Sequence, residues 1–172
     1  FGFASTLLDT LKKYGNKAPV MLSSSIQASL TGRFAGSEYG KSKLAGEELF
    51  QKYSKETGAK VLIYRFPNLF GKWCRPNYNS AVATFSNNIA NGLPITVNDR
   101  STELELLYID DLIEEMILAL NGEEHRDEQG FCICPVTFHV TLGEIVDLLY
   151  QFKESRNDLS VPDMSDGFTK RL

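Results

Sequence analysis

The sequence is poor in cysteine, has no long apolar run and carries no excess of positive charge. Its three cysteines, in a chain of 172 residues, are an odd number and are expected to be reduced thiols. No apolar stretch approaches the roughly 18 residues of a membrane-spanning helix, so a membrane protein is not indicated. The net charge of -4 offers no basic surface for nucleic acid. These absences favour an ordinary globular protein of the cytoplasm.

The sequence also lacks the turn Gly-x-Gly-x-x-Gly, which cradles the pyrophosphate of a dinucleotide. The glycines between positions 32 and 46 are spaced by four or six residues and cannot form it. Gly40-Lys41-Ser42 resembles the end of a triphosphate-binding loop, but Ala35 stands where that loop requires glycine. The sequence therefore argues against a nucleoside triphosphatase.

Metal-ligating residues are not clustered along the chain. His125 lies in a charged run, and His139 lies on an expected apolar strand without an acidic or cysteine partner. Cys132 and Cys134 are close in sequence but have no third ligand nearby. We predict no metal site.

The spacing of apolar residues alternates between strand-like and helix-like periods, which predicts a mostly parallel sheet flanked by helices. Thr141 and Glu144 have the spacing of a capping box, which predicts a helix from Thr141 through Tyr150. The other expected helices are 2–14, 38–56, 80–91 and 110–120, and the expected strands are 19–23, 60–65, 94–97, 103–107 and 130–134.

The segment Tyr39-Gly40-Lys41-Ser42-Lys43 is the main chemical signal. On a helix Tyr39 and Lys43 share a face, and an ammonium beside a phenol favours the phenolate that acid-base catalysis needs. Glu47 and Glu48 are expected among the exposed positions of the same helix. Tyr-x-x-x-Lys alone also occurs in helices where the tyrosine packs and the lysine is solvated.

The order of parts around this helix strengthens the signal. The serine run Ser23-Ser24-Ser25 follows an apolar run, so a hydroxyl is expected where a strand ends, in a place to hold a substrate carbonyl oxygen. A second strand runs into the segment from Arg65 to Gly71. Together these parts predict carbonyl reduction.

The same segments resemble the extended short-chain dehydrogenase/reductases, the NAD-dependent epimerase/dehydratase family. Ser25, Tyr39 and Lys43 match the catalytic serine, tyrosine and lysine of that family. Phe66-Pro67-Asn68 is similar to the family segment that passes the nicotinamide and reaches the sugar nucleotide. Tyr108-Ile109-Asp110-Asp111 is similar to the tyrosine-hydrophobic-aspartate-aspartate sequence that begins a helix late in the family's domain.

The resemblance implies a Rossmann-like sheet, of which this chain would hold the C-terminal portion. Residues 1–150 are expected to be a partial reductase domain without its glycine-rich first units. The polar, aperiodic residues 151–172 are expected to end that domain and lead toward a cupin domain. Segments 23–28 and 71–80 resemble the reductases of bacterial capsular polysaccharide synthesis that make UDP-N-acetyl-L-fucosamine.

The implied reaction is the reduction, by NADPH or alternatively NADH, of a UDP-linked 4-keto-6-deoxy-N-acetylhexosamine. Tyr39 would supply the proton and Ser25 would bind the keto oxygen, and a homodimer is expected. The expected cofactor-binding residues are Ser23, Ser24, Tyr39, Lys43, Phe66 and Pro67. The expected substrate-binding residues are Ser25, Asn68, Lys72, Arg75 and Arg100.

Departures from the family pattern narrow the choice among the reactions that the family catalyses. Ile26 and Gln27 stand where dehydratases have an acidic pair, which argues against dehydration. The residues after the serines also lack the Val-Tyr-Gly of many epimerases, so a 4-epimerase is the second hypothesis. A nucleotide-binding protein without turnover is the third, and the presence of both Tyr39 and Lys43 disfavours it.

Substrate contacts follow from two further observations. Leu104 replaces the arginine with which many relatives grip the diphosphate, so Lys72, Arg75 and Arg100 are the candidate cations. Asn68 follows a strand expected to be buried, where a polar amide is costly unless it bonds a partner, and a ligand is the favoured partner.

Overall fold

Two structural units, each with its own hydrophobic core, make up the protein. The computed structural model describes residues 2–172. The first unit contains the described residues up to Pro67 together with Met116–Ile133, and the second contains Asn68–Glu115 together with Cys134–Leu172.

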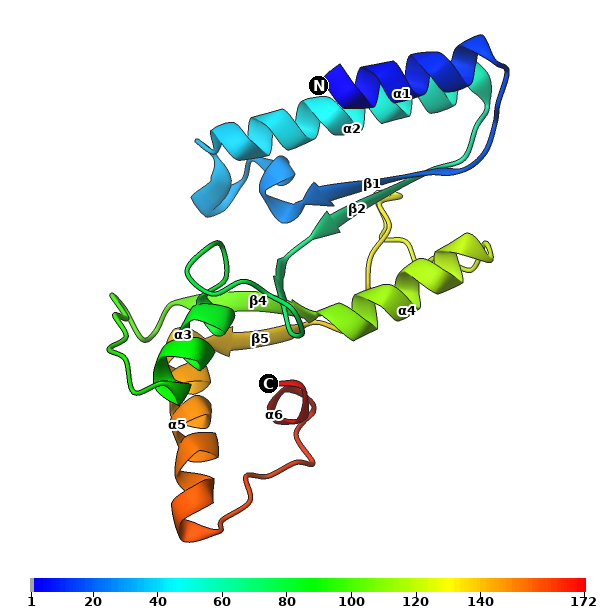
Figure 1. The fold of residues 1–172 in the computed structure, drawn as a ribbon. Helices are drawn as coiled ribbons and strands as arrows, with labels where there is room; N and C mark the ends of the chain where they lie inside the picture. Colours follow the sequence, from blue (N-terminus) through cyan, green and yellow to red (C-terminus); the bar gives the residue numbers. More distant parts are fainter. Residues whose placement is uncertain (1) are drawn as a thin grey trace. The chain divides into compact units, whose positions relative to one another are not determined.

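The first unit is built on two parallel strands with two helices on one side of them (Figure 1). β1 (Val20–Ser25) pairs with β2 (Val61–Phe66), so that Ser25 lies opposite Phe66 at the end of the pair. The helices α1 (Gly2–Lys13) and α2 (Glu38–Thr57) lie side by side. Two short 3-10 turns, η1 (Ile26–Ser29) and η2 (Gly32–Phe34), lead from the end of β1 to the beginning of α2.

Local sequence defines both ends of α2. The Ser37 hydroxyl accepts the backbone N–H of Gly40 at 2.9 Å and caps the first turn. Gly58, with φ of +69°, ends the helix in the left-handed conformation that glycine adopts without strain. The buried face of α2 completes a core that contains Leu8, Phe50, Tyr53, Ala59 and Ile63.

A three-stranded sheet forms the centre of the second unit. β4 (Glu103–Tyr108) lies between β3 (Asn68–Phe70), which is parallel to it, and β5 (Phe138–Thr141), which is antiparallel. The helices of the second half of the chain are α3 (Ala81–Ala90), α4 (Ile109–Leu120), α5 (Leu142–Asp158) and α6 (Gly167–Arg171). Among them, α3 packs against α5.

Aromatic rings join α6 to the sheet of the second unit. The Phe168 ring centroid lies 5.7 Å from that of Phe70 and 5.7 Å from that of Phe138. Asp166 caps α6 by accepting the backbone N–H of Thr169 at 2.7 Å. The last helix is therefore part of the core of the second unit.

Most of the expected elements are confirmed. The parallel pairs β1–β2 and β3–β4 confirm the mostly parallel arrangement. The helices expected at 2–14, 38–56, 80–91 and 110–120 are present with ends that differ by one residue at most. The capping box of Thr141 and Glu144 is also confirmed, because each accepts a backbone N–H of the other.

The helix that begins after this capping box is longer than expected. It continues to Asp158 instead of ending at Tyr150, and Phe168 beyond it is buried. The loss of periodicity after Gln151 therefore does not mark the end of ordered structure. A linker toward a further domain stays a prediction.

Two expected strands are wrong. Pro94–Val97 is irregular, because Pro94 has no N–H to donate and both edges of β4 already pair with β3 and β5. The segment 130–134 makes only isolated bridges at Cys132, to Tyr64 and to Arg126. In this segment the Asp127 side chain accepts backbone N–H groups, including that of Phe131 at 2.9 Å, and this competes with strand pairing.

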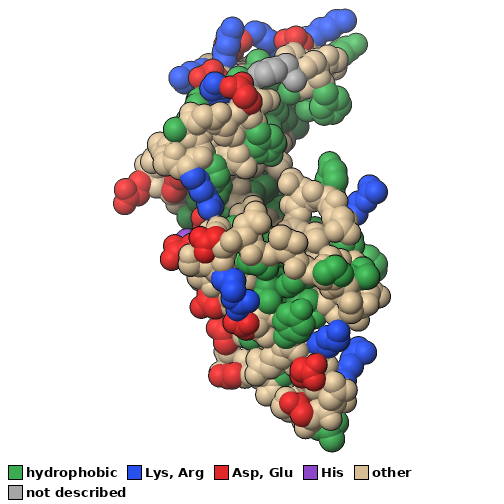
Figure 2. All heavy atoms as spheres, turned by 90° about the vertical axis from the view of Figure 1, so that its left-hand side faces the viewer, with side chains coloured by type: hydrophobic (Ala, Val, Ile, Leu, Met, Phe, Trp, Pro, Cys, Tyr) green, Lys and Arg blue, Asp and Glu red, His purple; other side chains and the backbone are tan. Residues whose placement is uncertain are grey.

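Lys60 forms a charged cluster in the first unit with Glu124 and Arg126, which lie in the segment that follows α4. Figure 2 shows that acidic and basic side chains lie on the surface of the protein. In the first unit, Glu124 accepts hydrogen bonds from Lys60 at 2.7 Å and from Arg126 at 2.9 Å. The bond from Lys60, with that from Arg126, lowers the pKa of Glu124 to about 2.

We expect Glu124→Gln to reduce the stability of the protein at neutral pH by about 1 kcal/mol, since Lys60 is partly exposed to solvent. Because folding lowers the pKa of Glu124, its contribution is present above the unfolded value near 4.5 and is lost as the pH falls toward about 2. Urea unfolding of both proteins across this range measures the difference. Glu123→Gln, at an exposed neighbouring position, is the control. A difference that stays constant at acid pH would contradict this interpretation.

Candidate active site

Ser25 stands at the junction of β1 and η1, as the sequence predicted for the end of a strand. Its Oγ accepts the backbone N–H of Gln27 at 3.2 Å and so caps η1. The residue is 8% exposed. Because the oxygen acts as the acceptor of this bond, the hydroxyl proton can be donated to another oxygen.

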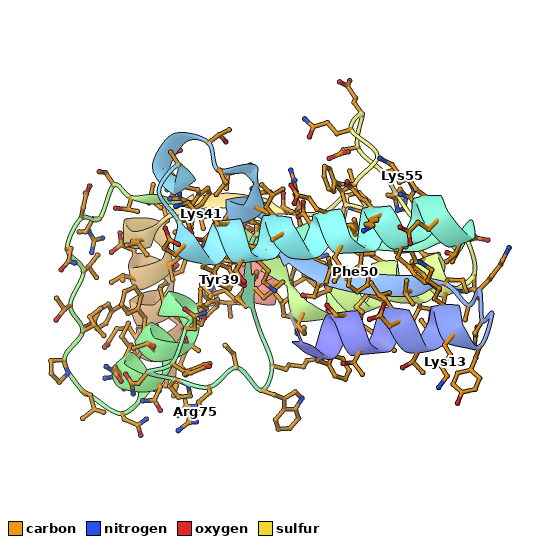
Figure 3. All side chains as sticks on the ribbon, turned by 90° about the horizontal axis from the view of Figure 1, so that it is seen from above. Lys13, Tyr39, Lys41, Phe50, Lys55 and Arg75 are labelled. Carbon is orange, nitrogen blue, oxygen red and sulfur yellow. The ribbon has the colours of Figure 1, made fainter. Side chains whose placement is uncertain are left out.

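Tyr39 and Lys43 lie on the first turns of α2. The Lys43 ammonium is 5.4 Å from the centroid of the Tyr39 ring and donates a hydrogen bond to the carbonyl oxygen of Ser23 at 2.9 Å. Tyr39 is 54% exposed, and Figure 3 shows it near the beginning of the helix. Lys43 thus connects the helix that carries the tyrosine to the strand that carries the serines.

A close backbone contact holds the beginning of α2 against η1. A Cβ added to Gly40 would lie 2.3 Å from the carbonyl oxygen of Gln27, which no real contact allows. The Ser37 hydroxyl donates to Oε1 of Gln27 at 2.8 Å across the same contact. The close contact therefore requires glycine at position 40, and the sequence pattern alone did not predict this requirement.

The expectation that Glu47 is exposed is wrong. Glu47 is 1% exposed, and its Oε2 accepts a hydrogen bond from Nη2 of Arg65 at 2.7 Å. The Ser24 hydroxyl donates to Oε1 of the same carboxylate at 2.5 Å. Glu47 is one helical turn beyond Lys43 on the same face of α2, but this spacing alone does not show that β1 and β2 cover Glu47.

This network separates the three serines of the run. The hydroxyl proton of Ser24 is already donated to Glu47, so Ser24 has no side-chain proton left to donate to a ligand. Ser23 is exposed and uses its carbonyl oxygen to hold Lys43. Of the three, the buried Ser25 keeps a hydroxyl proton with no acceptor assigned to it among the described residues; its role at a substrate and the roles of Ser23 and Ser24 in binding a cofactor stay predictions.

Phe66 and Pro67 end the first of the two chain segments that form the first unit. The β1–β2 register places Phe66 directly beside Ser25, and its ring stacks on Tyr64 with centroids 5.4 Å apart. Phe66 is buried and Pro67 is partly exposed. Their predicted place beside a nicotinamide is compatible with this register and stays a prediction.

The predicted substrate residues other than Ser25 lie in the second unit. Asn68 is exposed, and its Nδ2 donates to the carbonyl oxygen of Glu105 at 3.5 Å. The premise that this amide is buried is therefore wrong, because Asn68 is the first residue of a short strand. Its exposed position leaves it able to reach a ligand, and that role stays a prediction.

The three predicted cations differ in their surroundings. Lys72 donates to Asp110 at 2.6 Å, and this hydrogen bond raises the pKa of Lys72. The Arg75 guanidinium lies 6.0 Å from the centroid of the Tyr78 ring. Arg100 is ion-paired with Asp147 of α5 at 2.7 Å, so its charge is already partly neutralised.

One of the three predicted cations lines a cavity of about 430 Å³ in the second unit. Lys72 lines it, together with Phe70, Tyr108 and Arg171, whereas Arg75 and Arg100 are not among its lining residues. Arg171 binds the carboxylate of Asp111 through Nε at 2.6 Å and Nη2 at 3.0 Å. Sequence reasoning missed Arg171, because it lies in the segment that lacks periodicity.

Within residues 2–172, no three His, Cys, Asp or Glu side chains are grouped so that they could hold a metal ion. No helix of this described range is both long and apolar enough to cross a membrane.

Comparison with known proteins identifies the family of this chain and several relatives. The profile of the NAD dependent epimerase/dehydratase family matches residues 3–133. A reductase of Pseudomonas aeruginosa, UDP-2-acetamido-2,6-beta-L-arabino-hexul-4-ose reductase, is 38% identical over 96% of this chain and 43% of its own length. A crystal structure of the capsular polysaccharide assembling protein CapF from Staphylococcus aureus is 47% identical, covers 98% of this chain and 45% of that one, and superimposes with a TM-score of 0.90.

More distant matches include epimerases. UDP-glucuronate 4-epimerase 1 of Arabidopsis thaliana is 29% identical over 74% of this chain and 33% of its own length. UDP-glucose 4-epimerase of Thermus thermophilus, at 22% identity over 86% of this chain and 52% of that one, shares the fold with a TM-score of 0.68. The chain spans less than half the length of the two more similar relatives.

We expect Gly40→Ala to destabilise the protein by about 1–3 kcal/mol, because the added methyl group would overlap the backbone of Gln27. Gly46→Ala in the same helix is the matched control, since a Cβ there meets no atom within 4 Å. Alanine at position 46 should stabilise by up to about 1 kcal/mol through its higher helix propensity. Urea unfolding of both variants measures the two effects, and equal effects would contradict the close contact of α2 with η1.

Proposed function

Because the chain belongs to the NAD dependent epimerase/dehydratase family, we propose that it carries the proton-transfer residues of a nucleotide-sugar reductase. The proposed reaction is NADPH-dependent reduction of a UDP-linked 4-keto-6-deoxy-N-acetylhexosamine. The similarity to a UDP-sugar ketone reductase and to a capsular polysaccharide assembling protein supports this choice of substrate and of pathway, bacterial surface polysaccharide synthesis.

The arrangement of Lys43 carries the proposal. Its ammonium lies 5.4 Å from the Tyr39 ring centroid and is fixed by the carbonyl oxygen of Ser23 at 2.9 Å. The phenol, which can donate its proton, and the fixed ammonium therefore lie together on the first turns of α2. Tyr39 is half exposed and can reach a bound ligand.

In this proposal Ser25 and Tyr39 have different roles at the keto group. The Ser25 hydroxyl donates a hydrogen bond to the keto oxygen and stabilises the negative charge that grows on it. Tyr39 then transfers its proton to that oxygen while a hydride adds to the carbon. The C=O group becomes CH–OH, and the reduced nicotinamide, when bound, supplies the hydride and is oxidised.

The residues around Lys43 suit a nicotinamide cofactor in their chemistry. The ammonium of Lys43 and the hydroxyl of Tyr39 are hydrogen-bond donors on one face of α2, and ribose hydroxyls accept such bonds. We propose that Ser23, Ser24, Phe66 and Pro67, at the ends of β1 and β2, also contact this cofactor. The preference for NADP over NAD is part of the proposal.

Cations of the second unit are proposed to meet the diphosphate of the UDP-sugar. Lys72, Arg75 and Arg100 keep this assignment from the sequence, and Arg171 joins Lys72 at the cavity of the second unit. Lys72, Arg100 and Arg171 are each ion-paired, with Asp110, Asp147 and Asp111 respectively, so each of them would share its charge between that carboxylate and the diphosphate. Asn68 is assigned to the sugar, and the enzyme is proposed to act as a cytoplasmic homodimer.

A nucleotide-sugar 4-epimerase is the second candidate. The similarity to UDP-glucuronate 4-epimerase 1 is the observation that favours it. The two differ in cofactor balance, since a reductase consumes NADPH while an epimerase returns the hydride to the sugar.

We expect Tyr39→Phe in the complete protein to lower kcat for NADPH oxidation with a UDP-4-keto sugar by at least about 100-fold, because the proton donor is lost. Tyr14→Phe is the matched control, since Tyr14 is also exposed and has a lysine ammonium 5.6 Å from its ring. Steady-state rates of cofactor oxidation give the comparison. Equal rates in the wild-type protein and the Tyr39 variant would sink the assignment.

A further inference from the structure

The carboxylate of Glu47 is a buried charge behind the candidate active site. It is 1% exposed and accepts hydrogen bonds from Nε and Nη2 of Arg65 at 3.0 and 2.7 Å. The Ser24 hydroxyl donates a further bond to the same carboxylate at 2.5 Å. The guanidinium itself is confined, because its central carbon lies 3.7 Å from the centroid of the Phe131 ring.

These contacts join β2 to the two elements that carry the reacting residues, β1 and α2. Ser24 lies between Ser23, whose carbonyl oxygen holds Lys43, and Ser25 on β1. Glu47 follows Lys43 by one turn of α2. Arg65 lies opposite Ser24 in the parallel register of β1 and β2.

A contribution to stability does not by itself explain why Glu47 and Arg65 form a buried ion pair. Taking a carboxylate and a guanidinium out of water is costly, and apolar residues of similar volume often stabilise a core as well or better. What a forked guanidinium adds is direction, because two N–H groups fix the carboxylate in one orientation. The geometry here is fixed further by the serine hydroxyl on one side and the aromatic ring on the other.

We propose that Glu47 and Arg65 form a positioning pair that sets Lys43 and the end of β1 for proton transfer from Tyr39. The pair acts through Ser24 and through α2, and it does not touch the substrate. This inference rests on the proposed reductase function, which gives proton transfer its meaning.

The kinetic test uses Glu47→Gln in the complete protein, with Glu48→Gln as control, because Glu48 is the exposed neighbour of Glu47 on the same helix. We expect kcat for NADPH oxidation to fall about 10- to 100-fold in Glu47→Gln with KM for the sugar changed less than about twofold. The control should match the wild-type protein. A folded Glu47→Gln protein with unchanged kcat overturns the proposal.

Arg65→Lys separates geometry from charge. Lysine keeps the positive charge but loses the fork, so a positioning role predicts a loss of kcat similar to that of Glu47→Gln. A wild-type kcat in Arg65→Lys would show that only charge balance matters. If Glu47→Gln does not fold, Ser24→Ala removes a single bond of the network and should still lower kcat about 3- to 10-fold, and an unchanged kcat there overturns the proposal.

Hydrogen exchange tests the pair without reference to any reaction. We expect Glu47→Gln to raise amide exchange at Ser23–Gln27 and in the first turns of α2, and Glu48→Gln to leave it unchanged. Uniformly raised exchange over the whole first unit would mean that the pair supports only stability, which overturns the proposal. A wild-type protein that reduces no UDP-4-keto sugar but shows the local exchange pattern would refute the reductase and retain the positioning pair.

Discussion

The close approach of α2 to the turn after β1 is the constraint on which the candidate active site depends. Gly40 makes it possible, because a side chain there would occupy the place of the Gln27 carbonyl oxygen. Ser37 strengthens the contact by donating to the Gln27 side chain at 2.8 Å. The helix that carries Tyr39 and Lys43 is thus held against the strand end by backbone contact, which is a firmer support than long side chains provide.

Much of the first unit could be predicted because its signals are local. The helix that carries Tyr39 follows from apolar spacing and from its caps, and Lys43 lies on the same face for the same reason. The burial of Glu47 could not be predicted in this way, since it depends on which faces of α2 are covered. Its partner Arg65 belongs to another element, and the pairing is a property of the tertiary fold.

In the second unit, the errors came from treating segments by themselves. Pro94–Val97 has the composition of a strand but no free edge of β4 to join. Asn68 follows a buried strand, yet it begins a new short strand in the second unit and is exposed. Arg171 was missed because aperiodic polar sequence gave no sign that α6 packs into a core.

The central claim is that Tyr39 completes the reduction of a keto sugar whose carbon receives hydride from the cofactor. The most direct measurement uses the complete protein with a UDP-4-keto-6-deoxy-N-acetylhexosamine and NADPH that carries deuterium at the transferred position. The claim predicts one oxidised cofactor for each sugar and deuterium on the C4 carbon of the product. A sugar that is isomerised without deuterium and without accumulation of oxidised cofactor would contradict it.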